Sequence, residues 1–376
     1  MRPTPTEGFQ LDFLRKLQRL FNEGQFVATY KFALLNAIAD LAVECEDDLD
    51  GALTLSLDLV AEKFIELYWR HSLPFLGSDR DSAGLLVQNN GIQAGVLNLL
   101  ADMRNDHGIH TLAGLRAHRH WPTLVRKTRQ IVLKMPLWKL QFISGSHEDF
   151  LYPKTDSTLE IRLHPGIPYC LRLFHPLVLQ LTRHHWLEHI RAIPANKPLI
   201  GNSADLELFL FGEERAALTQ ASAFLHDLQK AQCFYCGRRI QEGAQVDHFI
   251  PWARYPRDLG FNFVLAHAKC NQDKRDTLAS LPHVERWLER NKNHEHAIFG
   301  NLSSYFPCDQ QLTYRIAAWA YGAERQSGSR LWDRNGIYTA FQPEISDILK
   351  SEVLRTNINS DTMNSHFPAL TLSNPR

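Results

Sequence analysis

The stretch that decides the fold runs from Cys233 to Lys274 and reads CFYCGRRIQEGAQVDHFIPWARYPRDLGFNFVLAHAKCNQDK. It opens with two cysteines at x2 spacing, Cys233 and Cys236, and it closes with His267 and Cys270 at the same spacing. Thiolate and imidazole donors in two such pairs suit a tetrahedral zinc ion. We therefore predict a structural Zn2+ site formed by these four residues.

The segment between the two pairs is longer than a simple zinc ribbon requires. Thirty residues separate Cys236 from His267, whereas a ribbon loop has about 15–20. VDHFIP (246–251) predicts a short strand ended by its proline, and NFVLA (262–266) predicts a second strand. CNQDKRDTLA (270–279) then begins a helix. The prediction is a ββα unit clipped together by zinc.

The polar residues around the zinc ligands indicate chemistry, because structural zinc needs only its ligands. Asp247 and His248 lie in the first predicted strand, and Asn271 directly follows the last ligand. Phosphodiester hydrolysis needs a base that activates water and a cation that neutralises the phosphate. Imidazole, with an unperturbed pKa of about 6.5, suits the base. Carboxylate and amide oxygens favour Mg2+ or Mn2+ over a second zinc ion.

Taken in order, these motifs resemble the HNH endonuclease family with its ββα-metal fold. The resemblance covers residues 233–276 and rests on CFYCG, VDHFIP, the asparagine of FNFVL, HAKCN and the lysine that follows. It implies that Asp247 is a ligand of a catalytic divalent ion and that His248 is the general base. It also implies that Asn271 is the second protein ligand of that ion.

Three further details of the resemblance concern the same site. Asn271 stands where the family name has its final histidine, so it brings an oxygen donor to the metal. Asn262 is expected to brace the strand that carries the base. Lys274 lies three residues after Asn271 on one helix face, where it is expected to contact a flanking phosphate.

Strand neighbours point to opposite faces, so Asp247 and His248 reach one site only if the strand ends or bulges there.

The whole chain predicts a mainly helical, multi-domain α+β protein. We expect a mainly helical N-terminal region with a small β element at 1–200 and an HNH nuclease module with structural zinc at 204–280. A C-terminal helical extension with a polar tail follows at 281–376. Alternating apolar residues at 138–142 and 159–163 predict two strands.

Other segments predict helices and a connection. Apolar residues at helical spacing mark three helices in the first 70 residues. ANKPLIGNS (195–203) is typical of a linker, and one helix is expected from 204 to 230. Further helices are expected near 279–292 and 312–325, and the tail beyond about 356 is polar.

The distribution of charge suggests a second surface for nucleic acid. The formal net charge is zero, so contacts to phosphate must come from local patches. No acidic residue occurs between His107 and His147, and Trp121 and Trp138 are interleaved there. The basic residues of this segment are Arg116, Arg119, Arg126, Lys127, Arg129, Lys134 and Lys139. Either they form a surface for a polyanion, or they pair with acids elsewhere in the chain.

Composition excludes several other classes. The chain contains no GxGxxG, GxxxxGK[ST] or GxSxG motif, which leaves dinucleotide, Walker-type and serine-hydrolase chemistry unsupported. No apolar run approaches 18 residues, and the N-terminal sequence lacks an apolar signal core. Three of the six cysteines lie at the paired positions, as in metal sites of reducing compartments. We expect a cytoplasmic protein without a membrane partner.

The sequence therefore predicts a divalent-metal-dependent HNH endonuclease that hydrolyses DNA by nicking or by double-strand cleavage, and we expect the DNA to be double-stranded. By family habit we expect a role in bacterial restriction or anti-phage defence, with defence-system proteins as possible partners. Two alternatives stay open. One is a zinc module that binds nucleic acid without cutting it, and the other is an RNA-directed nuclease.

Overall fold

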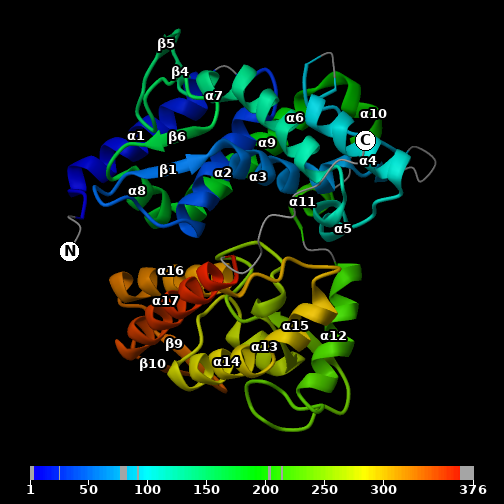
Figure 1. Ribbon diagram of the computed structural model, residues 1–376, viewed down its shortest axis with the longest axis vertical. Helices are drawn as coiled ribbons and strands as arrows, with labels where there is room; N and C mark the ends of the chain where they lie inside the picture. The colour runs from blue at the N-terminus through cyan, green and yellow to red at the C-terminus, as the bar shows by residue number, and fades with distance from the viewer. Residues whose placement is uncertain are drawn as a thin grey trace, which may run out of the picture. The chain divides into compact units, whose positions relative to one another are not determined.

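The structure, a computed structural model, describes residues 4–24, 26–76, 83–90, 93–201, 205–212 and 215–364. It divides into two compact units, residues 1–214 and 215–376 (Figure 1). Helices dominate both units, and every sheet in the described part has two strands. This confirms the mainly helical α+β fold. The division at 1–200, 204–280 and 281–376 stays a prediction.

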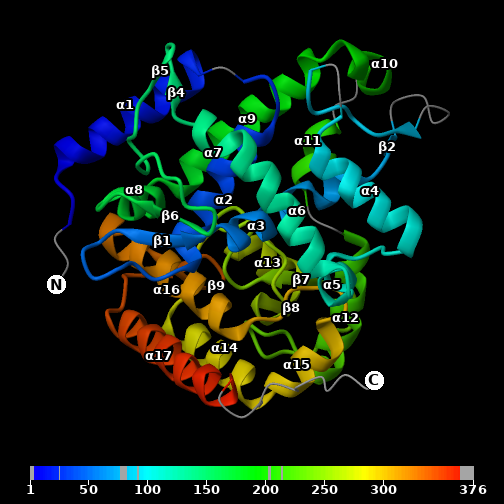
Figure 2. The ribbon, with the colours of Figure 1, turned by 45° about the horizontal axis from the view of Figure 1, so that its top comes forward.

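The first unit is built around one buried helix, α2 (Tyr30–Glu44), whose residues from Lys31 to Glu44 are all buried. Helices α3, α8 and α9 pack against it (Figures 1 and 2). The other helices of this unit are α1 (Glu7–Glu23), α3 (Leu57–Trp69), η1 (Arg70–Ser72), α4 (Gly95–His107), α5 (Leu112–Ala117), α6 (Trp121–Lys134), α7 (Pro136–Lys139), α8 (Ile167–Leu173), α9 (His175–Ala192), η2 (Pro194–Asn196), α10 (Lys197–Ile200) and α11 (Leu206–Phe211).

Three antiparallel strand pairs accompany these helices: β1 (Leu53–Ser56) with β6 (Glu160–Leu163), β2 (Phe75–Leu76) with β3 (Ala83–Gly84), and β4 (Phe142–Ile143) with β5 (Ser146–His147). The three helices expected before residue 70 are present as α1, α2 and α3. The strand expected at 159–163 is present as β6, and it pairs with β1 from Leu53↔Leu163 to Ser56↔Glu160.

Three expectations for the first unit and its end were wrong. The strand expected at 138–142 begins only at Phe142, in β4, whereas Trp138 and Lys139 belong to helix α7, because Pro136 occupies the first helical position that proline favours. The supposed linker folds into η2 and α10, where the buried Asn196 side chain hydrogen-bonds the backbone of Val87. Two helices, α11 and α12, replace the single helix expected at 204–230, and Gly212 caps the first of them.

The second unit contains the motif and the C-terminal helices. Its elements are α12 (Arg215–Leu228), β7 (Ala244–His248), η3 (Gly260–Asn262), β8 (Phe263–His267), α13 (Ala268–Lys274), α14 (Leu281–Asn293), α15 (Glu295–Leu302), α16 (Gln310–Ser327), β9 (Leu331–Arg334), β10 (Ile337–Thr339) and α17 (Glu344–Asn364). The expected ββα unit is present as β7, β8 and α13. Helices α16 and α17 lie side by side (Figures 1 and 2). Residues 365–376 of the predicted polar tail lie outside the described residues.

Helix α14 holds the start of β8 through buried hydrogen bonds. The side chains of Trp287, Arg290 and Asn291 all donate to the carbonyl oxygen of Phe261, at 2.9, 2.9 and 3.2 Å. Arg290 also donates to the carbonyl oxygen of Phe263 at 2.6 Å. Burial lowers the pKa of Arg290 to about 10, so its charge is retained at neutral pH. Helix α14 thus fixes the strand that leads into the second pair of candidate zinc ligands.

We predict that Arg290→Met loosens this strand. The variant keeps an apolar stem but removes the donor to Phe263, and a hydrogen bond to a charged group contributes about 2 kcal/mol. Amide hydrogen exchange of residues 261–267 should become roughly 30-fold faster. Glu289→Gln, an exposed change on the same helix, is the control. Equal exchange in Arg290→Met and wild type would contradict the clamp.

Candidate metal and nuclease site

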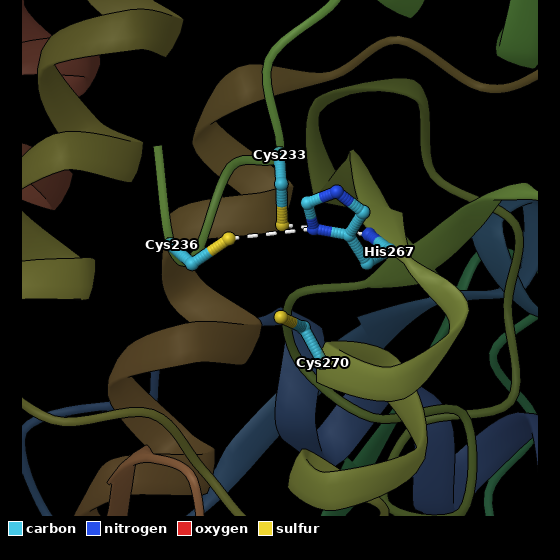
Figure 3. A group of neighbouring side chains, drawn as sticks. All are labelled: Cys233, Cys236, His267 and Cys270. Atoms are coloured by element: carbon cyan, nitrogen blue, oxygen red, sulfur yellow. Dashed lines mark hydrogen bonds between the residues drawn. The ribbon is translucent and has the colours of Figure 1, made fainter. Parts of the chain in front are cut away.

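Three cysteines and one histidine converge on one point in the second unit. Cys233 and Cys236 lie on the loop after α12, His267 ends β8, and Cys270 lies in the first turn of α13. Their candidate donor atoms all lie within 4.8 Å of one another. Figure 3 shows the four side chains around a common centre. In the described part of the chain, no other group of His, Cys, Asp and Glu donors is gathered in this way.

Hydrogen bonds orient the histidine ring within this group. His267 Nδ1 lies 3.3 Å from Cys236 Sγ (Figure 3), and its Nε2 lies 3.3 Å from the carbonyl oxygen of Arg239. A carbonyl only accepts, so Nε2 carries the proton and Nδ1 presents its lone pair to the cysteines. Ligating histidines are commonly oriented through their second nitrogen in this way.

The electrostatics of the thiols fit a cation at the centre. Burial opposes ionisation of Cys236, but hydrogen bonds, above all those from Arg238, outweigh it and lower the pKa of this thiol to about 6. Burial and then the charges of Cys233 and Cys236 raise the pKa of Cys270 to about 12. The protein alone therefore does not ionise all three thiols. A zinc ion would, and its tetrahedral bonds of about 2.3 Å to sulfur suit donors gathered this closely.

Asp247 is buried at the end of β7 and is held by two donors. Both donors, the Tyr235 hydroxyl and Lys274 Nζ (3.0 Å), bind its Oδ2 atom. Burial, and then the charge of Asp247, raises the pKa of Tyr235, so that hydroxyl stays protonated. Lys274 is itself fully buried and also donates to the carbonyl oxygen of His248 at 3.0 Å. This ammonium therefore fixes the strand end, which differs from the phosphate contact that its helix position suggested.

His248 is paired with an acid that the motif did not reveal. His248 is 5 % exposed, and its Nε2 lies 2.8 Å from Oδ1 of Asp258. Because a carboxylate accepts, Nε2 carries the proton and Nδ1 keeps its lone pair. Asp258 is the sole acid between Asp247 and Asp273 in the sequence. This isolated acid was the one sign in the sequence that His248 could have a carboxylate partner.

The two asparagines of the motif lie in different settings. Asn262 is 3 % exposed, and its amide accepts from the Ile250 nitrogen at 2.8 Å and donates to the Ile250 oxygen at 2.9 Å. It thereby supplies a substitute strand partner just beyond β7. Asn271 is partly exposed and donates from Nδ2 to Gln245 Oε1 at 3.0 Å, which leaves its amide oxygen unused by that bond.

The strand geometry sets how these groups can share a site. β7 and β8 pair without a register shift from Ala244↔His267 to His248↔Phe263. Asp247 contacts Tyr235 and Lys274, whereas the His248 ring lies against Phe263 on the paired strand. The recorded contacts of the two side chains have no residue in common. The β7–β8 pairing contains no bulge. Because β7 ends at His248, the end of the strand is the place where the side chains of Asp247 and His248 can approach one site.

The acid-free segment is only partly available for a polyanion. Arg129 pairs with Asp58 at 3.0 Å, and Arg116 pairs with Glu66 at 3.4 Å. Arg126, Lys127 and Lys134 of α6 are exposed, and their side chains have no ion-pair partner among the described residues. One part of the segment is therefore paired with acids elsewhere in the chain, and another part is available to contact a polyanion. No helix in the described ranges has the length and apolarity to cross a membrane.

Two segments of the chain match known protein families. Residues 233–280 match the family described as HNH endonuclease, which confirms the resemblance seen in the motifs. The second unit thus carries an HNH endonuclease domain with a Cys/His group that could hold zinc. Residues 10–205, more than half of the chain, match a second family, and the chain belongs to it: a domain of unknown function, DUF8808. No curated protein and no solved structure matches the chain significantly.

We predict that Cys270→Ser removes zinc and unfolds the ββα unit. Structural zinc contributes on the order of 10 kcal/mol in small modules, which a unit this small cannot replace by apolar burial. Metal analysis of the purified chain should give one zinc per wild-type chain and much less in the variant. Cys308→Ser, at a cysteine outside the group, is the control. One zinc per chain in Cys270→Ser would contradict the four-ligand assignment.

Proposed function

We propose that this protein is a divalent-metal-dependent endonuclease that hydrolyses phosphodiester bonds of DNA. The observation that carries the proposal is the His248–Asp258 pair at the end of β7, next to Asp247, inside a domain that matches the HNH endonucleases. A purely structural zinc module has no need of an oriented imidazole at this position.

His248 acts as the general base through Nδ1. It takes a proton from a water molecule while the water oxygen bonds to phosphorus, and the bond from phosphorus to the leaving ester oxygen breaks. Asp258 keeps the proton on Nε2 and stabilises the charged ring after the transfer. Asn262 and Lys274 act as positioning residues, because each binds the backbone on one side of the strand end.

Asp247 and Asn271 would hold the divalent ion through oxygen atoms, which favour Mg2+ or Mn2+. The two donors to Asp247 occupy Oδ2, so Oδ1 is the atom suited to a metal. When bound, the ion would neutralise charge on the scissile phosphate and the leaving oxygen. Lys274 keeps Asp247 oriented toward that role.

The choice of DNA as the substrate rests on the resemblance to the HNH endonucleases. The exposed cations of α6 also support it, because they could contact phosphates of the DNA backbone independently of the base sequence. A setting in bacterial restriction or anti-phage defence, with duplex DNA as the target, is the further part of the proposal. Phage plating on cells that express wild type or His248→Ala tests this setting. Equal efficiency of phage plating on cells with wild type and cells with His248→Ala would contradict the proposed role in defence.

The direct test of catalysis is cleavage of supercoiled plasmid by the zinc-loaded chain. With Mg2+ we expect nicked or linear product, none with EDTA, and a rate about 10²–10⁴ lower for His248→Ala because the base is lost. Asp258→Asn should fall between them, since the amide can still hold the ring but offers no charge. A matched RNA substrate in parallel separates the two nuclease alternatives.

Lys292→Gln serves as the control for this assay, because it changes an exposed side chain outside the Asp247–His248 site. Zinc content and thermal unfolding of each variant show whether the fold is intact. Near-normal cleavage by His248→Ala would contradict the mechanism. Nucleic-acid binding without any cleavage, by a folded wild-type chain, would favour the non-catalytic adaptor.

A further inference from the structure

A large pocket lies on the zinc-ligand face of the second unit, where neither the proposed mechanism nor the family match assigns a ligand. Its volume is about 990 Å3. Cys236, His267 and Cys270 contribute to its wall, and so does the tip of the hairpin formed by β9 and β10. The pocket is therefore built jointly by the HNH domain and the C-terminal part of the same unit.

Basic side chains dominate the wall of this pocket: Arg238, Arg239, Lys269, Arg286 and Arg334. Asp273 is the sole acid among the lining residues. A zinc ion bound by three thiolates and one imidazole adds one further negative charge. The net charge of the wall is then about +3, which favours an anion of high charge density.

The hairpin tip is fixed against α13. Asp273 Oδ2 accepts from Trp332 Nε1 at 2.9 Å and from the Gly336 nitrogen at 2.8 Å. Asn335 and Gly336 have positive φ values of 46° and 72°, the conformation of a two-residue hairpin turn. These bonds occupy the acid and fix the hairpin tip that carries Arg334, so this part of the pocket wall is preorganised.

Not every cation of the wall is available to a ligand. The Arg238 side chain hydrogen-bonds Cys236, which raises the pKa of that guanidinium. Arg286 donates to the carbonyl oxygens of Phe234 and Tyr235, at 2.7 and 3.3 Å. By contrast, the side chains of Arg239 and Lys269 are exposed, and no partner is recorded for them among the described residues.

The pocket lies close to the nuclease site through α13. Lys269, Cys270 and Asp273 of this helix line the pocket, whereas Asn271 reaches Gln245 of β7 and Lys274 reaches Asp247. One short helix thus has one side toward the pocket and another toward β7. A nucleic-acid strand that crosses β7 would meet the proposed metal ligand Asn271 on one side of α13 and the basic wall of the pocket on the other.

We propose that this pocket binds phosphate esters, with Arg239 and Lys269 as the principal ligand-binding residues. The phosphates come either from the strand being cut, outside the scissile position, or from a free nucleotide. The first source rests on the proposed nuclease function, and the second does not. A neutral or cationic ligand would lose the charge complementarity of the wall.

The test measures binding of a fluorescein-labelled 20-base-pair duplex by anisotropy at several salt concentrations. The full zinc-loaded chain carries His248→Ala, so that no cleavage occurs. Adding Arg239→Gln and Lys269→Gln should lower the salt slope by about 1.8, since each phosphate contact contributes about 0.9. Lys292→Gln with Lys350→Gln, exposed and outside the pocket, is the charge-matched control and should leave the slope unchanged.

Calorimetric titration with ADP and with inorganic phosphate separates the two sources. Binding of ADP that the Arg239 and Lys269 changes abolish, with an unchanged duplex slope, would assign the pocket to a free nucleotide. The proposal is overturned if neither duplex nor ADP binding responds, or if the control pair changes the slope equally. Zinc content of one per chain in all variants excludes a folding effect. Because binding is measured without cleavage, failure of the nuclease proposal would be seen separately.

Discussion

The convergence of three cysteines and one histidine is the constraint on which the second unit depends. The four residues come from a loop, the end of β8 and the start of α13. A ββα unit of this size buries too little apolar surface to hold three such elements together. A metal bound at their junction fixes all three at once, because the binding free energy becomes folding free energy.

That junction also sets the position of the proposed catalytic groups. Cys270 is followed directly by Asn271, and one helical turn later by Lys274, which reaches Asp247 and the backbone of His248. Any shift of α13 would therefore move the strand end that carries His248, the proposed base. From the other side, α14 fixes the approach to β8 through the Phe261 carbonyl. The strand end is held between α13, which the candidate zinc site would anchor, and the packed helix α14.

Sequence predicted this unit well where spacing alone determines geometry. Paired ligands at x2 spacing, a proline after a strand pattern and an asparagine after the last ligand each leave a local signal. β7, β8 and α13 follow these signals, although β7 ends at His248, three residues before Pro251. Asp258 left only a weak signal, since its pairing with His248 depends on how the loop folds back. The burial of Lys274 was hidden for a similar reason: a lysine on a helix face is usually exposed, and only its buried acid and carbonyl partners explain its place. Trp138 and Lys139 were wrongly assigned to a strand, because alternating apolar residues also suit a short helix that begins at proline.

The central claim is that the zinc-anchored ββα unit hydrolyses phosphodiester bonds. The most direct measurement is cleavage of a short DNA duplex by the full chain with Mg2+ in H2 18O, followed by mass spectrometry of the new terminal phosphate. Attack by water that His248 activates places one solvent oxygen in that phosphate, and the account predicts this product from wild type but not from His248→Ala. Cleavage without 18O in the terminal phosphate, or equal labelled product from both proteins, would contradict it.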